Sequence, residues 1–368
     1  MIQIDREKKI PLYMQVYESL VQLIQTKQWQ TGELLPSERE LSVLFAVDRL
    51  TVRRALGMIA QEGLVEKIAG LGTRVTDASP LVKDYQNFRN VIFLLPKVTK
   101  NGNFVDRITD PIKTDLFFRL ENECKKRDYN LTYTTIGPEE VLSEVLEGRY
   151  ISGVFFASKI DDKFFEEARR LKIATVVLDN ECDFFPSIRP AREKGTYEAI
   201  KYLISQNHRQ ICFISGLNGY ITAKDCFEGY KRALGDANIE WKDQIIKEGD
   251  WTFDGGYKAM QEIIAEHPQL PSAVFACNDL TALGAMEAIK AAGYAVPRDI
   301  SVIGVDDIEQ SKYGCPKLST VRVNVAAMAS IACQNLLLAI ESREMQNVQM
   351  FLPTELVIRE STAPRNAR

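Results

Sequence analysis

Carboxylate and amide side chains follow several short apolar runs of this sequence, and a tryptophan accompanies them. The pairs are Asp179-Asn180, Asp250-Trp251, Asn278-Asp279 and Asp306-Asp307. Their oxygens accept hydrogen bonds from hydroxyl groups, and an exposed indole stacks on the C–H face of a sugar ring. Taken singly, each acid or amide is more often a helix cap, and Trp251 is more often a core residue. Together they are suited to binding a small carbohydrate.

A second pattern that could do chemistry is a group of three arginines, Arg49, Arg53 and Arg54, with no acid on the same side of a predicted helix. Asp48 can cap that helix, and apolar residues recur on its opposite side at 3.6-residue spacing: Val52, Leu56 and Ile59. Arginine side chains on a helix can reach guanine edges or phosphate oxygens in the major groove. For an isolated arginine pair, a solvated surface is the commoner explanation, so the flanking elements decide.

Two further helices precede the arginine helix. Ser37 and Glu40 form a capping box that starts a short helix, whose apolar stripe is Leu41, Leu44 and Phe45. Pro11 opens an earlier helix with apolar positions at Leu12, Val16, Leu20, Leu23 and Ile24. We expect this first helix to pack behind the other two.

A small hairpin is predicted after the arginine helix. Residues 65–68 read as a strand, residues 69–72 as a turn and residues 73–75 as the returning strand. Gly70 and Gly72 lack Cβ atoms, so the turn can bring its backbone amides close to a sugar-phosphate strand. The hairpin is therefore predicted to act as the wing of a DNA-reading domain.

The segments LPSERELS, VDRLTVRRAL, EGLVEK and GLGT resemble the winged helix-turn-helix signature of the GntR family of bacterial transcription regulators. The resemblance implies DNA contacts from Arg39, Arg49, Thr51, Arg53, Gly70 and Thr73. Two positions depart from the family pattern: Asp48 stands where Ser is common, and Leu50 where Thr or His is common. Asp48 can keep the capping role, whereas Leu50 alters a contact to the operator.

Length and composition set the frame for these motifs. The 368 residues predict two or three domains, and 45% apolar with 26% charged residues is ordinary for a soluble globular protein. The net charge is −4, and residues 1–80 contain ten basic and ten acidic residues. DNA binding is therefore argued from local clustering and not from net charge.

Other residue types limit the function classes. Seven scattered cysteines form no CxxC pair or metal-ligand spacing, so we expect reduced thiols, no metal and no cofactor. The N-terminus lacks the order of a signal peptide, and no apolar run approaches bilayer length, which predicts a cytoplasmic protein without membrane contact. The two histidines, His208 and His267, lie in polar contexts and are expected at the surface. No Ser/His/Asp set can be assembled.

The rest of the chain predicts an α/β fold. Apolar runs at 91–95, 131–135, 153–157, 174–179, 210–215, 273–277 and 300–305 alternate with predicted helices, including one near 112–127 and one near 138–147. Such continuously apolar strands are typical of parallel sheets covered on both faces. We expect a winged helix-turn-helix domain at residues 1–77, a linker at 78–89, and a domain at 90–368 with two parallel sheets. In such folds, ligands bind beyond the carboxyl ends of the strands.

Segments of this second part, such as TAKDCFEGYKRAL, SAVFACNDLTALGAMEAI and VPRDISVIGVDD, resemble the LacI/GalR family of regulators. Its effector domain has the two-lobed fold of periplasmic sugar-binding proteins and mediates dimerisation. The resemblance implies effector contacts from Asp110, Trp251, Asn278 and Asp306, with Asp279 behind them. Together with the GntR-type head, it points to the architecture of arabinose-responsive repressors of Gram-positive bacteria.

Two positions depart from the LacI/GalR pattern. Cys226 stands where the family places an effector-binding arginine, and Ala191 where an acid precedes a helix. Lys224 or Arg189 could supply the missing donor. An insertion around residues 97–107 is expected to change the mouth of the cleft.

We therefore expect a DNA-binding regulator that is not an enzyme. It is most simply a homodimeric repressor of a sugar-utilisation operon, with operator DNA and a sugar effector as its partners. A transport-type sugar-binding protein is the alternative, although it would leave the head unexplained. A dehydrogenase or kinase would need GxGxxG or a phosphate-binding loop, and neither occurs. The sugar, the sense of its effect and the operator sequence stay open.

Overall fold

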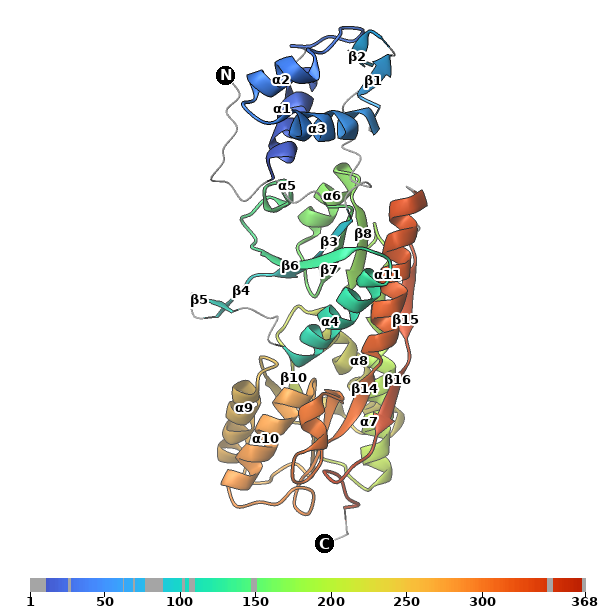
Figure 1. The fold of residues 1–368 in the computed structure, drawn as a ribbon. Coiled ribbons are helices and arrows are strands. Elements are labelled where there is room, and N and C mark those ends of the chain that lie inside the picture. The colour runs from blue at the N-terminus through green and yellow to red at the C-terminus, as the bar shows by residue number, and fades with distance from the viewer. Residues whose placement is uncertain are drawn as a thin grey trace. The chain divides into compact units, whose positions relative to one another are not determined.

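The computed structural model describes residues 11–25, 28–61, 63–68, 70–76, 89–100, 103–105, 110–146, 151–342 and 347–365. The chain divides into two compact units, which are described separately (Figure 1). The boundary between them falls at residue 87, within the predicted linker, and residues 77–88 lie outside the described ranges. The domain limits therefore stay a prediction.

The described residues of the first unit form three helices and a hairpin, as the sequence predicts. The elements are α1 (Leu12–Gln25), α2 (Glu38–Leu44), α3 (Arg49–Gln61), β1 (Val65–Ile68) and β2 (Gly72–Val75), with β1 and β2 antiparallel. The capping box of Ser37 and Glu40 is present at α2, and the backbone N–H of Thr51 donates to Asp48 at 2.8 Å. The apolar stripes of the helices form one core, in which Val16, Leu20, Leu41, Val52 and Ile59 are fully buried.

The second unit contains two lobes, each built on a six-stranded sheet. Lobe 1 has the strand order β15-β9-β8-β7-β3-β6, with every neighbouring pair parallel. Its strands are β3 (Asn90–Pro96), β6 (Asn130–Ile136), β7 (Gly153–Ala157), β8 (Ala174–Leu178), β9 (Ser187–Pro190) and β15 (Gln349–Leu352). Helices α4 (Pro111–Lys125) and α11 (Val325–Ser342) cover one face, and α5 (Leu142–Val145) and α6 (Asp162–Arg170) cover the other.

Lobe 2 has the strand order β11-β10-β12-β13-β14-β16, in which only the β14–β16 pair is antiparallel. Its strands are β10 (Ile211–Ser215), β11 (Ile246–Glu248), β12 (Ala273–Ala276), β13 (Ser301–Asp306), β14 (Ser319–Val323) and β16 (Thr354–Val357). Helices α7 (Arg192–Ser205) and α8 (Ile221–Asp236) cover one face, and α9 (Phe253–Glu266) and α10 (Asp279–Ala291) cover the other. Two short 3₁₀ turns, η3 (Trp241–Asp243) and η4 (Glu309–Lys312), complete it.

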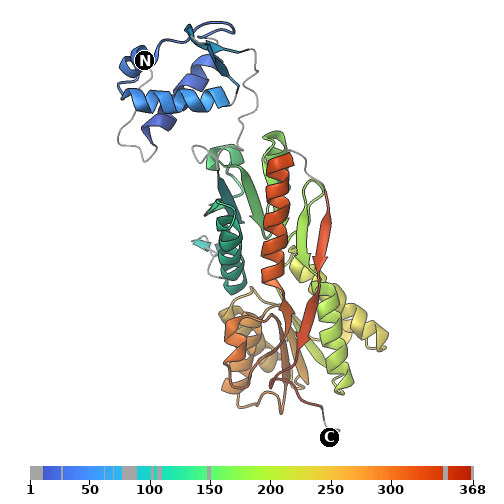
Figure 2. The same cartoon turned by 45° about the vertical axis from the view of Figure 1, so that its right-hand side comes forward.

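The chain passes between the lobes at three places. Ala191 follows β9 and precedes α7, Asn324 joins β14 to α11, and Pro353 joins β15 to β16. Figure 1 shows α11, β15 and β16 at the right-hand side of this unit, and in the turned view of Figure 2 the same red elements run from one lobe toward the other. Three short crossings at one side leave the lobes able to move about a hinge.

Several sequence expectations need correction. The helix expected near 138–147 is only the four-residue α5, because Gly137 and Pro138 begin a turn before it. The expected insertion around residue 97 contains a hairpin of β4 (Val98–Lys100) and β5 (Asn103–Val105). The late strands β14, β15 and β16 were not among the predicted apolar runs. Strands β15 and β16 are short and partly exposed, and β14 (STVRV) contains polar residues although most of it is buried.

The expectation that no apolar run approaches bilayer length was also wrong. By length and composition alone, helix α11 is long and apolar enough to cross a membrane, and half of that span is buried inside the protein. It packs on α4 and on strands β7 and β8, so its apolar residues belong to the core of lobe 1.

His208 is buried and not at the surface as predicted. Its Nδ1 lies 3.0 Å from Ser272 Oγ and its Nε2 lies 3.0 Å from the Ala363 carbonyl oxygen. Burial lowers the pKa of His208, which favours the neutral ring. The polar neighbours of His208 did not predict its burial, because the C-terminal segment around Ala363 folds back over the residue.

Candidate functional site

A small cavity lies between the two lobes, at the carboxyl ends of strands from both sheets. Its volume is about 40 Å³, and we call it the core cavity. All four predicted effector-binding residues line it: Asp110, Trp251, Asn278 and Asp306. The remaining lining residues are Ile112, Lys113, Ser158, Asp179, Arg192, Tyr220, Thr222 and Cys277. The fold thus brings together residues from distant segments, while their role in binding stays a prediction.

Two of the predicted residues, Asp110 and Asn278, also cap helices, and their part in effector binding stays a prediction. Asp110 accepts a hydrogen bond from the Ile112 N–H at 3.1 Å and starts α4. Asn278 accepts from the Thr281 N–H at 3.0 Å, and its amide donates to the Trp251 carbonyl at 2.9 Å. Capping fixes these side chains at the cavity edge instead of leaving them free to rotate.

Trp251 is held by its surroundings in an unusual conformation. Its φ is +62°, a left-handed backbone that side chains other than glycine seldom adopt. The indole packs directly on Gly216, where an added Cβ would lie 2.2 Å from the ring, and it meets Tyr220 edge to face at 4.7 Å. Two aromatic rings therefore stand at one wall of the core cavity.

Arg192 is the residue at this site that sequence reasoning missed. It is the first residue of α7, immediately after a crossing between the lobes, and only 6% of its side chain is exposed. Its guanidinium lies 3.1 Å from Asp179 Oδ1, after β8 of lobe 1, and 3.2 Å from Asp306 Oδ1, at the end of β13 of lobe 2. One buried cation therefore joins an acid from each lobe. An arginine in the cleft that begins a helix after Pro190-Ala191 carries no local signal of this role.

The charges of this triad affect one another. Burial opposes the positive charge of Arg192, yet the carboxylates of Asp179 and Asp306 raise its pKa above the usual value. Burial raises the pKa of Asp306 well above its usual range, and the charge of Arg192 opposes that shift. Arg192 therefore stays charged, while Asp306 holds its proton more tightly than an exposed aspartate does.

The two departures from the LacI/GalR pattern lie beside this triad. Cys226 is fully buried, and a hydrogen bond from the Cys277 thiol lowers its pKa, with the nearby charge of Arg192 acting in the same direction. Ala191 directly precedes Arg192. Thus the cleft has a guanidinium after all, supplied from the start of α7 instead of from the position of Cys226.

The two residues expected to replace the missing arginine do not line the core cavity. Arg189 lies in β9, with Nη1 3.5 Å from Asp225 of α8, which is a second ion pair between the lobes. Lys224 lines a separate, larger cavity described below. Asp279 also lies outside the lining: it accepts hydrogen bonds from Thr320 Oγ1 at 2.5 Å and from the Ile308 N–H at 2.9 Å.

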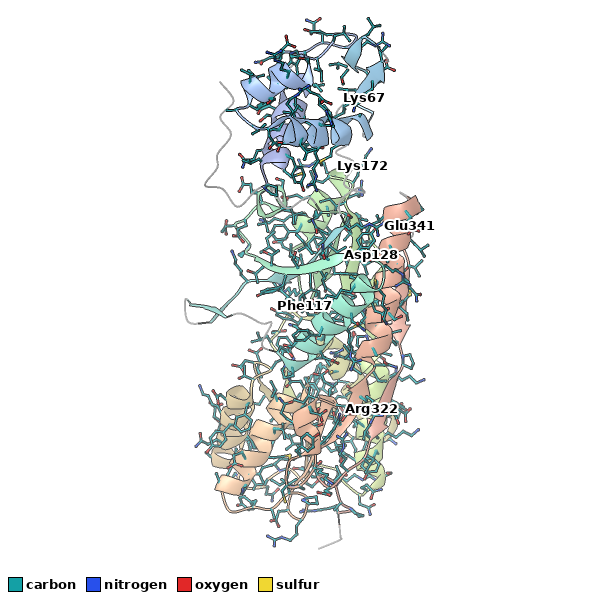
Figure 3. The ribbon with its side chains drawn as sticks, in the orientation of Figure 1. Lys67, Phe117, Asp128, Lys172, Arg322 and Glu341 are labelled. Atoms are coloured by element: carbon teal, nitrogen blue, oxygen red, sulfur yellow. The ribbon has the colours of Figure 1, made fainter. Side chains whose placement is uncertain are left out.

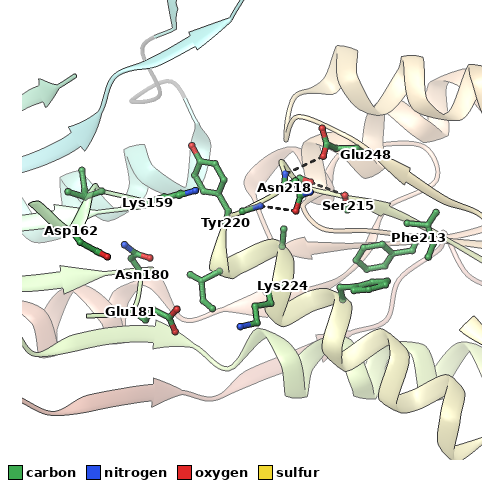
Figure 4. Close-up of a pocket in the computed structure, with 17 residues that line it drawn as sticks. Lys159, Asp162, Asn180, Glu181, Phe213, Ser215, Asn218, Tyr220, Lys224 and Glu248 are labelled. Atoms are coloured by element: carbon green, nitrogen blue, oxygen red, sulfur yellow. Dashed lines mark hydrogen bonds between the residues drawn. The ribbon is translucent and has the colours of Figure 1, made fainter. Parts of the chain in front are cut away.

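A second cavity between the lobes adjoins the first and has a volume of about 670 Å³. We call it the outer chamber. Figure 4 shows Lys159, Asn180 and Glu181 of lobe 1 on one side of it, with Asn218, Tyr220 and Lys224 of lobe 2 facing them. Tyr220 lines both cavities, so its ring stands at their junction.

The residues predicted to contact DNA are exposed or, for Thr51 and Thr73, partly exposed. Two of them, Arg53 and Thr51, have hydrogen-bond partners in the protein. Arg39 and Arg49 are exposed on α2 and α3. Helix α3 itself carries no acid, but Arg53 donates from Nε and Nη2 to Glu38 of α2 at 3.0 and 2.9 Å. The acid was missed because it comes from the neighbouring helix. The Thr51 hydroxyl donates to Asp48 Oδ2 at 2.7 Å.

The first unit carries further exposed charged and apolar side chains on α3 and β1. Hydrogen bonds from Arg53 hold the pKa of Glu38 below its usual value, and the charge of Lys67 on β1 (Figure 3) adds to this. Arg54 stacks over the Tyr13 ring at 3.8 Å. Leu50 is 73% exposed at the start of α3.

The wing has the backbone that its glycines predict. Gly70 and Gly72 have φ values of +78° and +120°, and no atom lies within 4 Å of a Cβ built on either one. Thr73 follows on β2 and is partly exposed. The turn is therefore sterically open on the side where a sugar-phosphate strand is expected.

No group of three or more His, Cys, Asp or Glu side chains suited to a metal ion occurs among the residues that the structure describes. The acids of the cleft are instead paired with Arg192 or with backbone N–H groups.

Comparisons with known proteins agree with this geometry. The family model for bacterial regulatory proteins of the gntR family matches residues 12–75, and the model for a periplasmic binding protein-like domain matches residues 200–362. The probable HTH-type transcriptional repressor ExuR of Bacillus subtilis is 35% identical over 267 residues, which cover 71% of this chain and 80% of that protein. The ribose operon repressor of Haemophilus influenzae is 30% identical over 268 residues, with 71% and 80% covered.

Solved structures show the same fold for the second unit. A LacI family regulator from Enterococcus faecium with bound ribose has a TM-score of 0.67 and 26% identity, covering 75% of this chain and all of that one. A lac repressor dimer bound to operator has a TM-score of 0.66 and 21% identity, covering 75% and 94%. The gntR match over the head favours a regulator over the transport-type alternative. The chain therefore belongs to the helix-turn-helix transcriptional repressors, with a gntR-family DNA-binding head joined to a LacI-type effector domain.

Proposed function

We propose that this chain represses sugar-utilisation genes in the cytoplasm, and that a small carbohydrate bound in the cleft between the lobes controls its hold on operator DNA. One observation carries the proposal: Asp110, Trp251, Asn278 and Asp306 converge on one cavity whose walls come from both lobes. A ligand that contacts both walls binds one relative position of the lobes better than others, and this difference shifts the conformational equilibrium.

The chemistry of the core cavity suits hydroxyl groups. Its acids and amide accept hydrogen bonds, Arg192 and Lys113 donate them, and Trp251 offers an aromatic face. The charged groups that line the cavity are the acids Asp110, Asp179 and Asp306 and the cations Lys113 and Arg192. When Asp306 keeps its proton, these groups have little net charge. A neutral polyol therefore fits without bringing an uncompensated charge into a buried site.

Arg192 is placed to couple the ligand to the lobes. Because it contacts Asp179 of lobe 1 and Asp306 of lobe 2, a sugar hydroxyl that accepts from Arg192 or donates to either acid alters the interaction between the lobes. Closure or opening about the three crossings then changes the spacing of two heads in a homodimer. A two-fold dimer matches two half-sites of a palindromic operator.

The proposed DNA contacts are Arg39, Arg49, Thr51, Arg53, Gly70 and Thr73. The Thr51 hydroxyl donates its proton to Asp48. Its oxygen can still accept a hydrogen bond from a DNA base. Leu50 extends from the start of the recognition helix, where an apolar side chain can contact a thymine methyl group.

The experiment is fluorescence anisotropy of the purified chain with a duplex from its own upstream region, with and without a panel of sugars. Tight binding that one sugar weakens supports the proposal. Arg53→Ala should weaken binding and reduce the salt dependence by about one counterion. Trp251→Ala should remove the sugar response and leave DNA binding intact. Binding that no sugar alters would overturn control by a carbohydrate, and unfolding in either variant would remove its support for the assigned role.

A further inference from the structure

The two cavities of the cleft differ greatly in size. The core cavity has a volume of about 40 Å³, far less than that of its neighbour. The outer chamber of about 670 Å³ falls within the range of about 300–1,000 Å³ that is usual for small-molecule sites. The polar residues assigned by family resemblance therefore account for only the smaller part of the space between the lobes.

The junction of the cavities is aromatic. Tyr220 lines both spaces and meets Trp251 edge to face, with ring centroids 4.7 Å apart. Lys159 of lobe 1 places its ammonium 5.4 Å from the Tyr220 ring centroid (Figure 4). A chain of sugar rings has apolar C–H faces that can stack on such rings in succession, while its hydroxyls point to the polar walls.

The charges of the outer chamber discriminate between ligand classes. Its wall carries the cations Lys159 and Lys224 and the acids Asp162, Glu181 and Glu248. A phosphate or carboxylate group would face more acids than bases. Hydroxyl groups, in contrast, can donate to the carboxylates and accept from the ammonium groups and from Asn180 and Asn218.

We propose that the effector is an uncharged oligosaccharide, a disaccharide or longer, with one terminal unit at the core cavity and the next unit in the outer chamber beyond Tyr220. This inference rests on the proposed function and adds the class of its ligand. It assigns Tyr220 and Lys224 to recognition of the second unit, and it makes the chamber the source of selectivity for length.

The test is isothermal titration calorimetry of the full chain with matched sets of sugars. Each set contains a monosaccharide, its disaccharide and trisaccharide, and the 6-phosphate of the monosaccharide. We expect one disaccharide or trisaccharide to bind at least about tenfold more tightly than its own monosaccharide, because the second unit adds hydrogen bonds to charged groups. Tightest binding by a monosaccharide or a sugar phosphate overturns the inference.

The variant Lys224→Met locates the second unit. We expect it to lower affinity for the longer sugar about tenfold and to leave affinity for the monosaccharide unchanged, because Lys224 lines only the outer chamber. Lys258→Met, on the outer helix α9, makes the same change of charge at a 77% exposed side chain and should alter neither affinity. Equal effects of Lys224→Met on both sugars overturn the assignment.

The same titrations separate this inference from the proposed function. A monosaccharide that binds best and releases the operator duplex leaves the proposed function standing and overturns the oligosaccharide. A chain that binds its operator but no sugar of any length overturns both.

Discussion

The head and the cleft each contain an arginine bound to carboxylates, but in opposite surroundings. Arg53 of the head pairs with Glu38 at 2.9 Å, and their side chains are 58% and 25% exposed. Arg192 of the cleft pairs with Asp179 and Asp306 at 3.1 and 3.2 Å, and only 6% of its side chain is exposed. Water screens the first pair, whereas the second has lost most of its hydration.

This difference separates a contact that can be exchanged from one that holds the structure. A DNA phosphate can take the place of Glu38 because both partners are already hydrated, so little is lost when the pair opens. Separating Arg192 from Asp179 and Asp306 leaves buried charges without partners inside the protein, where little water can replace the lost contacts. The head is therefore suited to trade partners, and the cleft to move only when a ligand supplies equivalent hydrogen bonds.

The largest expected effect comes from removing the buried cation. Arg192→Met leaves Asp179 and Asp306 facing each other without their partner, and we expect it to lower the free energy of unfolding of the second unit by about 3–5 kcal/mol. Urea denaturation followed by tryptophan fluorescence measures this, since Trp241 and Trp251 both lie in that unit. Arg119→Met, which breaks an exposed pair with Asp115 on α4, is the matched control and should change little. Equal effects of the two substitutions would show that burial does not distinguish these pairs.

The buried carboxyl group of Asp279 should make the free energy of unfolding fall as the pH rises. A carboxylate whose pKa is lowered by a partner has the opposite effect. Burial raises the pKa of Asp279 to about 7 from an ordinary value of 3.8, so the folded state holds a proton that the unfolded state releases. Its contribution to stability is therefore lost as the pH rises from about 4 to about 7, by at most about 1.4 kcal/mol per pH unit.

Asp279→Asn tests this prediction because asparagine does not titrate. The free energy of unfolding of the variant should fall less than that of the parent between pH 4.5 and pH 6.5, with all other groups shared. Parallel curves for the two proteins would show that Asp279 is ionised throughout this range.

A smaller effect is expected where the backbone supports the aromatic wall. Gly216→Ala places a methyl group against the Trp251 indole, and overpacking of this kind costs about 1–3 kcal/mol. Gly235→Ala, near the end of α8, meets no atom within 4 Å and should instead stabilise the protein by up to about 1 kcal/mol. Thermal unfolding of both variants measures the difference, and the near-ultraviolet circular dichroism of Gly216→Ala should change as the indole moves. Similar behaviour of the two variants would contradict the close packing of Trp251.

These residues show why the head was easier to predict than the cleft. The capping box at Ser37, the cap at Asp48 and the wing glycines act over a few residues, so local sequence determines them. The effector residues were grouped through family resemblance; in the fold they line one cavity, and their contact with an effector stays a prediction. Arg192 was missed because its partners, Asp179 and Asp306, lie 13 and 114 positions away and only the assembled sheets bring them together. Glu38 was missed for the same reason, because it lies on α2, 15 positions from Arg53.

The smallest expected effect concerns the exposed pair of the head. Glu38→Gln removes an anion from the DNA-facing side and leaves Arg53 without its ionic partner, so we expect severalfold tighter binding to non-specific duplex DNA. The dependence of log K on log salt should steepen by about one, because one more cation is available to displace counterions. Glu18→Gln on α1 makes the same change of charge on another helix of the head and should leave the slope unchanged. Because Glu38 also fixes the direction of Arg53, affinity for the operator should rise less than affinity for other sequences. An equal rise for both would show that Glu38 acts on DNA through its charge alone and does not orient Arg53.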